Sequence, residues 1–315
     1  MLDSTTRRLW ARRAAGLAAL SVLAAVLGPE ALAQVPGPTP VIPPPVLDTI
    51  VEDFRVAIQA AQPALLAIAA STFGVLAVIE IALSAIIWTL RESGPERILT
   101  ALVLKLAWLA FAFSLIASFG VWFPPVLDSF HQAGLAVAPG VVSPGDVLGL
   151  GVQLSTAMLS AFFDGLGLMD LSFNLLATAI LVAVAALLVE LMYAVIAASV
   201  VVVLVESYVA LAAGALVLGF AAFRGTASLA DRFVAYVFNL GVRLFSLFLL
   251  VGIGYQVAQG WLPIITGSRD DVAAMLAVLG GSLTFTLLVV VIPVKVSSLL
   301  TQNLSVGFER ALNSV

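Results

Sequence analysis

The chain has 315 residues, of which 62% are hydrophobic and only 10% are charged, whereas an ordinary soluble domain carries about 25% charged residues. So much apolar surface does not fit inside one globular core, so the composition predicts an all-α polytopic membrane protein. The chain has no cysteine and one histidine, which excludes disulfides, thiolate metal sites and a histidine metal cluster. Its two lysines both lie outside a G-x-x-x-x-G-K-[ST] context, which excludes a P-loop. We therefore expect no cofactor and no enzymatic activity, and ATP-driven work would fall to a partner.

Residues 1–33 have the features of a secretory signal peptide. Four arginines precede a short apolar segment at 14–27, and residues 31–33 form an A-x-A cleavage site directly before Gln34. This order is typical of signal peptides, and the apolar segment is too short to span a bilayer. We expect cleavage after Ala33, which would place the mature N-terminus on the periplasmic face of a bacterial inner membrane.

Residues 34–63 are expected to form a tether followed by an amphipathic helix. Residues 35–45 contain six prolines, a composition typical of an extended polyproline II spacer. From residue 46 to 62, apolar side chains recur at helical spacing, and the charged side chains lie on the opposite face. The pattern predicts a helix that lies on the membrane surface or on a partner.

Residues 64–123 are expected to hold the first two membrane spans, at 64–90 and 98–123, joined by the polar turn RESGPER. Residues 124–170 differ because they contain four acids, no lysine or arginine, and frequent proline and glycine. A loop without basic residues belongs on the outer face under the positive-inside rule. We therefore expect a periplasmic loop at 124–170, with a short helix at 152–163.

An apolar run from residue 171 to 223 is interrupted only by Glu190 and Glu206. As one helix it would be about 80 Å long, against about 30 Å of hydrocarbon, so its length alone favours two spans. The basic residues favour a single net crossing, which places six loop lysines and arginines inside and two outside; two crossings would place three inside and five outside. With one crossing, the surplus length projects beyond the membrane, tilts steeply, or re-enters without crossing.

Two further spans are expected at 233–257 and 272–294, so that residues 171–294 form the transmembrane core. Trp261, between these two spans, has the position of an interfacial anchor. Residues 295–315 are expected to be a short cytoplasmic tail with a helix. The whole pattern predicts five net crossings, with the N-terminus outside and the C-terminus inside.

Charged side chains in or near the spans are candidate functional residues, because a charge near the bilayer centre costs about 3 kcal/mol. For Lys105 and Arg243, pairing between helices or snorkelling at a span end is the favoured interpretation. For Glu80 and Glu190, the structural and functional interpretations are balanced. The charges interpreted as possible structural ones are Glu80, Lys105, Arg224, Arg232 and Arg243.

Glu206 lies deep in the longest apolar run, which favours a role in a conduit or in subunit packing. Few partners for Glu206 are available in the same chain: Tyr208 and Thr226 are close in sequence, and Arg224 could reach it only if the chain turns back. We therefore expect a neighbouring copy to supply hydrogen-bond donors. Gly214 and Gly219 lie where small residues let helix backbones approach closely. They would allow the neighbouring copy to come near.

The stretch 200–261 resembles the central signature of the TrbL family, the polytopic inner-membrane subunits of conjugative type IV secretion systems. The family more often has a glycine-rich segment and a lysine where this chain has AAFRG and Arg243. The positions that carry the resemblance are Glu206, Gly214, Gly219, Phe220, Thr226, Ala230, Tyr236 and Gly241, which shortly precedes a basic residue.

The resemblance implies a scaffold and channel subunit without enzymatic activity. Several copies would assemble in the inner membrane, surrounded by lipids, with secretion-system ATPases, pilin or stalk subunits and other inner-membrane subunits. Single-stranded DNA with its relaxase, or a protein substrate, would pass outward. Two alternatives stay open: a transporter of small solutes, and an assembly factor without a conduit. The candidates for a conduit or a subunit interface are Glu206, Glu190, Gly214, Gly219, Phe220, Thr226 and Tyr236.

Overall fold

The computed structural model describes residues 46–90, 94–137, 143–163, 173–267 and 271–313. The expected signal peptide and proline-rich tether lie outside these ranges. The secondary structure of the described residues is helical, and six of their helical segments are long and apolar enough to cross a membrane, which confirms the all-α polytopic class. The elements in chain order are α2 (Val46–Leu90), α3 (Pro95–Ala117), α4 (Phe119–Val137), α5 (Pro144–Phe163), α6 (Phe173–Leu218), the 3-10 helix η1 (Gly219–Ala222), α7 (Ala227–Gln259), α8 (Leu262–Gly267) and α9 (Val272–Asn313).

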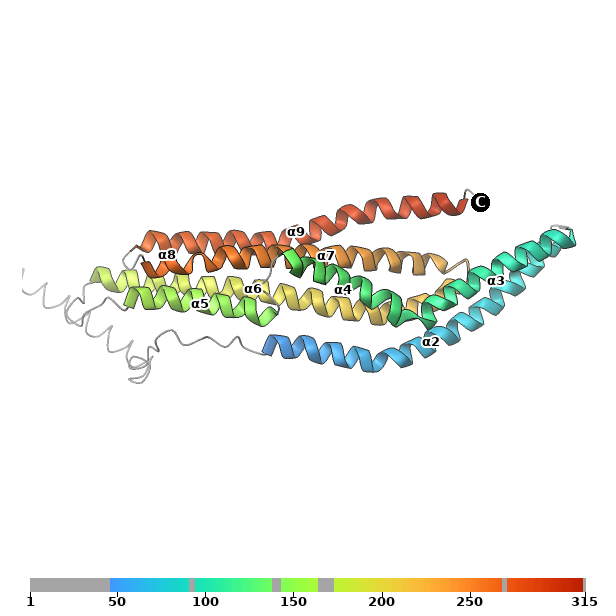
Figure 1. The fold of residues 1–315 in the computed structure, drawn as a ribbon, viewed down its shortest axis with the longest axis horizontal. Coiled ribbons are helices and arrows are strands. Elements are labelled where there is room, and N and C mark those ends of the chain that lie inside the picture. Colours follow the sequence, from blue (N-terminus) through green and yellow to red (C-terminus); the bar gives the residue numbers. More distant parts are fainter. Residues whose placement is uncertain (1–45, 91–93, 138–142, 164–172, 268–270, 314–315) are drawn as a thin grey trace, which may run out of the picture.

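The helices run back and forth along one long axis (Figure 1). α3, α4 and α5 follow one another in the direction opposite to α2, so together they form one return path between α2 and α6. α6, α7 and α9 then alternate in direction. Neighbouring passes pack on one another: α2 and α5 on α6, α4 on α7, and α9 on both α6 and α7. This alternation is the arrangement that repeated membrane crossings require.

The long apolar run folds as one unbroken helix, α6, of 46 residues. At 1.5 Å per residue this helix is about 69 Å long, more than twice the hydrocarbon thickness of about 30 Å. An unbroken helix follows one axis without reversing, so it crosses a bilayer at most once. The 3-10 turn η1 and the following turn then reverse the chain into α7.

α6 packs against different helices along its length. In its first half, the Tyr193 ring lies 6.0 Å from the Phe285 ring of α9, and a Cβ on Gly151 of α5 would lie 2.4 Å from the Tyr193 Cβ. Near its C-terminal end, a Cβ on Gly219 of η1 would lie 2.8 Å from the Ala69 carbonyl oxygen of α2. The first half of α6 is therefore level with α5 and α9, and its end is level with the middle of α2.

The expected amphipathic helix and the first span are one helix, α2, with Pro63 inside it. A proline removes one helix hydrogen bond and bends the helix rather than always ending it. α2 packs on α6, and near its N-terminus Asp48 Oδ1 accepts a hydrogen bond from the Gly145 backbone N–H of α5 at 3.1 Å. Tertiary contacts of this kind override a local helix breaker. The tail is likewise continuous with the fifth span, because α9 extends to Asn313.

The segment 124–170 contains far more helix than the expected loop with one short helix. α4 includes Pro124 and Pro125, and stacking of Phe119 on Phe123 (4.9 Å) and contact of Phe123 with Phe233 of α7 (5.2 Å) hold it in place. α5 is glycine-rich but half-buried within the bundle. Proline and glycine are more frequent in membrane helices than in soluble ones, so their presence here was a poor signal for a loop.

Candidate functional site

Glu206 of α6 accepts hydrogen bonds from two side chains of α7. The Tyr236 hydroxyl donates to Glu206 Oε1 at 2.8 Å, and Arg243 Nη1 donates to Oε2 at 2.6 Å. Tyr236 and Arg243 are two turns apart, so they lie on the same face of α7. The partners of Glu206 therefore come from the same chain, not from a neighbouring copy as expected. The side chains of Glu206 and Arg243 are 29% and 26% exposed, so the cluster lies at the edge of the α6–α7 contact.

A second cluster surrounds Glu80 of α2, which is 2% exposed. Lys105 of α3 donates to its Oε1, and Arg224 donates from Nε to Oε1 at 2.7 Å and from its backbone N–H to Oε2 at 3.1 Å. Arg224 also donates from Nη2 to Ser84 Oγ at 3.1 Å. The turn after α6 is thereby fixed to the α2–α3 hairpin. Among the described residues, Arg224 thus pairs with Glu80, and it is not a partner of Glu206.

Gly214 and Gly219 are contact points within the chain. A Cβ on Gly214 would lie 1.8 Å from the Phe233 ring of α7, so only glycine allows this approach of α6 and α7. Gly219 allows the close approach of η1 to Ala69 of α2. Both glycines are buried. Within one copy, both glycines therefore have a role in packing, whereas the sequence led us to expect that they admit the backbone of a neighbouring copy.

The remaining candidates divide between structural and exposed positions. The Thr226 hydroxyl donates to the Phe220 carbonyl at 2.8 Å, which stabilises the turn between η1 and α7. Phe220 and Arg232 are exposed. Glu190 is half-buried on α6, and among the described residues its carboxylate takes part in no ion pair or hydrogen bond.

Sequence reasoning did not find the contacts of Ser84, Ala69 and Phe233. The spacing of Ser84 could have indicated its contact, because Ser84 follows Glu80 by four residues and so lies on the same face of the helix. Ala69 and Phe233 are ordinary apolar residues of apolar helices, and no local pattern marks them. Among the described residues, no group of histidine, cysteine and acidic side chains has the arrangement of a metal site.

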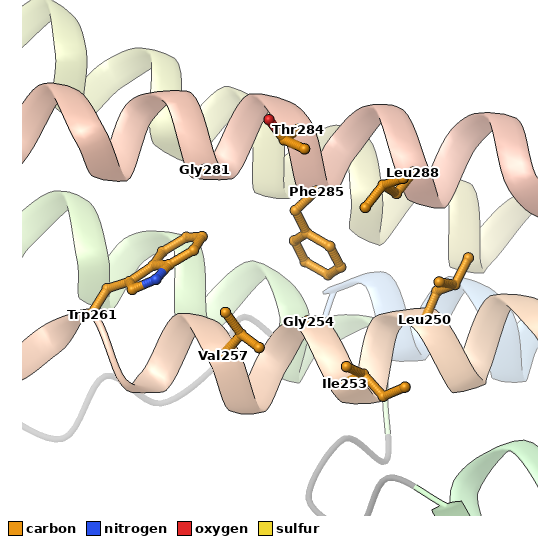
Figure 2. A pocket seen from close by; sticks show the side chains of 9 residues that line it. All are labelled: Leu250, Ile253, Gly254, Val257, Trp261, Gly281, Thr284, Phe285 and Leu288. Carbon is orange, nitrogen blue, oxygen red and sulfur yellow. The ribbon is translucent and has the colours of Figure 1, made fainter.

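An apolar groove of about 360 Å³ lies between α7 and α9 (Figure 2). Gly254 and Gly281 line it, and each lets an aromatic ring pack closely against the helix backbone: a Cβ at Gly254 would lie 1.9 Å from the Phe285 ring, and a Cβ at Gly281 would lie 2.8 Å from the Trp261 ring. Trp261 lies at one end of the groove, and Thr284 contributes a hydroxyl on α9. A second hollow of about 330 Å³ continues along the same seam beside Trp261. The residues that line the main groove are Leu250, Ile253, Gly254, Val257, Trp261, Gly281, Thr284, Phe285 and Leu288.

Long apolar helices with large exposed apolar side chains define a multi-pass helical membrane protein. The chain belongs to the family described as "TrbL/VirB6 plasmid conjugal transfer protein", which it matches over residues 77–292. This confirms the resemblance and extends it well beyond residues 200–261. The match includes both ion-pair clusters and the groove.

Two curated relatives are similar over much of the chain. The "Probable conjugal transfer protein TrbL" of Sinorhizobium fredii (strain NBRC 101917 / NGR234) is 29% identical over 226 residues, which cover 71% of this chain and 56% of the relative. The "Conjugal transfer protein TrbL" of Rhizobium radiobacter is 27% identical over 263 residues, which cover 83% of this chain and 64% of the relative. The chain thus spans less than two thirds of the length of either relative.

Proposed function

We propose that the chain is an inner-membrane scaffold or channel subunit of a conjugative type IV secretion apparatus. It would help to pass single-stranded DNA with its relaxase, or a protein substrate, across the inner membrane. The observation that carries this proposal is the family match over residues 77–292. The relatives from Sinorhizobium fredii and Rhizobium radiobacter are both named for conjugal transfer.

The arrangement of the charges supports a scaffold. Lipid is as apolar as the helices themselves, so helices in a membrane are held together by close packing and by polar contacts. Here Glu80 and Glu206 each link helices through charged partners, and Gly214 and Gly219 allow close contact between elements. A chain built in this way offers rigid surfaces to other copies and to further inner-membrane, stalk and ATPase subunits.

The N-terminus would lie in the periplasm and the C-terminus in the cytoplasm. The distribution of basic residues supports this orientation. The part-exposed Glu206–Tyr236–Arg243 cluster is the candidate for a hydrophilic surface on otherwise apolar helices. A channel subunit would expose such a surface to its substrate, whereas an assembly factor would not contact substrate at all.

The test uses a donor strain in which the gene is deleted and complemented. Loss of plasmid transfer in the deletion strain, restored by the full chain, is the expected result. A photo-crosslinking residue placed at Val202 or Val209, two exposed positions of α6 near Glu206, should then capture transferred DNA or relaxase during mating. Loss of transfer without any substrate crosslink would favour the assembly factor, and unchanged transfer in the deletion strain would refute the proposal.

A further inference from the structure

Glu190 differs from Glu80 and Glu206 because its carboxylate is without a partner among the described residues of its own chain. Glu80 and Glu206 are each neutralised by a cation of the same chain. In the described ranges, no side chain pairs with Glu190. An isolated carboxylate in an apolar environment is strongly unfavourable, so it binds a partner or takes up a proton. Either form of Glu190 needs a hydrogen-bond partner from outside this copy.

Glu190 borders an apolar ridge on the outer face of α6. The ridge consists of side chains that point away from the bundle and are 42–66% exposed. Because they recur every three to four residues, they form one continuous stripe along the helix. The side chains of this ridge are Ile180, Val184, Leu187, Leu191 and Val195.

The groove between α7 and α9 lies on another side of the bundle from the ridge. α6 passes behind α9 in Figure 2, so the groove opens on the side away from α6. The ridge, in turn, faces away from α7 and α9. One copy therefore carries a ridge on one side and a groove on the opposite side, which is the arrangement of a head-to-tail contact between identical subunits.

The ridge and the groove lie at the same depth along the bundle. The Tyr193 and Phe285 rings are 6.0 Å apart, which aligns α6 with α9 at this level. Glu190 precedes Tyr193 by about 4.5 Å along α6, and Gly281 precedes Phe285 by about 6 Å along α9, which runs in the same direction. Rotation about the bilayer normal leaves depth unchanged, so Glu190 of one copy meets this level of the next.

We propose that the α6 ridge of one copy seats in the α7–α9 groove of a second copy, with Glu190 beside Trp261 and Thr284 of that copy. This proposal rests on the proposed function in one respect: it takes a second copy of the chain as the partner. Among the described residues, no acceptor engages the Trp261 indole N–H, which can donate to a carboxylate. The Thr284 hydroxyl oxygen can accept from Glu190 when that side chain is protonated. A lipid acyl chain would fill the groove but would leave Glu190 unpaired.

Cysteine crosslinking tests this contact directly, because the chain has no cysteine of its own. Two differently tagged copies, one with Leu191→Cys and one with Thr284→Cys, are co-expressed and oxidised in isolated membranes. The two positions differ in depth by only about 1.5 Å relative to the Tyr193–Phe285 level. A disulfide forms only when the Cα atoms come within about 7 Å, so a product carrying both tags reports this interface.

Leu283→Cys is the matched control for Thr284→Cys. Leu283 is 48% exposed on the same helix at nearly the same depth but does not line the groove. We expect a crosslink with Thr284→Cys that is several-fold stronger than with Leu283→Cys. It should weaken several-fold when Glu190→Leu is added and persist with Glu190→Gln, which keeps the hydrogen bond.

Absence of a two-tag product, as lipid in the groove would give, overturns the proposal. Equal crosslinking at Leu283→Cys and Thr284→Cys, or no effect of Glu190→Leu, does so as well. The readout is made in membranes and does not depend on plasmid transfer. A specific crosslink in a chain that is dispensable for transfer would refute the proposed function while leaving the contact established.

Discussion

Replacing Glu80 by alanine is expected to destabilise the folded chain by about 3 kcal/mol. Removing one member of a buried ion pair typically costs about 3–5 kcal/mol, because the remaining charge is left without compensation. Lys105 is only 14% exposed and would stay without a counter-ion, whereas the Arg224 side chain is 64% exposed and can regain solvent. The lower end of the range therefore applies.

The free energy of unfolding can be measured by SDS titration of the purified chain in detergent micelles. Glu52→Ala is the matched control, because Glu52 lies on the same helix and pairs with Arg55 where both side chains are well exposed. Exposed pairs contribute little to stability, so this variant should unfold almost as the parent does.

A further variant separates the lost ion pair from a general packing defect. Replacing both Glu80 and Lys105 by leucine removes the uncompensated charge, and apolar replacements of buried pairs are often tolerated. The double variant should regain a substantial part of the stability lost in Glu80→Ala. If Glu80→Ala unfolded together with Glu52→Ala, or if the double variant were less stable than Glu80→Ala, the Glu80 ion pair would not be the source of the stability.

Gly214→Leu should lower the amount of folded protein, because its side chain would collide with Phe233. Gly74→Leu, where a Cβ meets nothing within 4 Å, should leave the yield unchanged, and similar yields for both would contradict the close α6–α7 packing. Tyr236→Phe should leave folding intact because Arg243 still pairs with Glu206, and a loss of folded protein in this variant would argue against that view. Mass spectrometry of the membrane-purified chain should give Gln34 as the first residue, and a start at Met1 would rule out cleavage. Phosphatase and fluorescent-protein fusions after Gly140, Ser228 and Val315 should report outside, inside and inside, in that order. An active phosphatase at Ser228 would contradict a single crossing of α6.

Much of the fold could be predicted from the sequence because apolar length is a strong signal. The membrane class, the helical class and the positions of most long helices follow from composition and from runs of apolar residues. The apolar run 171–223, interrupted only by Glu190 and Glu206, indicated the extent of α6. It did not show that the run forms one unbroken helix. Residues 124–163 were misjudged because proline and glycine were weighed as in a soluble protein. Their helices depend on long-range contacts such as that between Phe123 and Phe233.

The partners of the membrane charges could not be predicted in the same way. Glu206 and Arg243 are 37 residues apart, and Glu80 and Arg224 are 144 residues apart. Helical periodicity shows which face of a helix a residue occupies, but it does not show which helix lies opposite that face. The sequence therefore identified the charges that need compensation, but it did not identify the two α7 side chains that contact Glu206.

The length of α6 also limits what can surround it. Its exposed apolar side chains extend from Ile180 to Val209, a distance of about 44 Å. At the average tilt of about 20°, this stripe still projects over about 41 Å, more than the hydrocarbon thickness of about 30 Å. A protein surface that faces water rarely carries so long an apolar patch without a partner. Unless α6 tilts well beyond the average, part of the stripe is covered by protein. The Glu190 contact would cover the first half of the stripe, which leaves the region of Val202 and Val209, next to Glu206, for a different neighbour or for substrate.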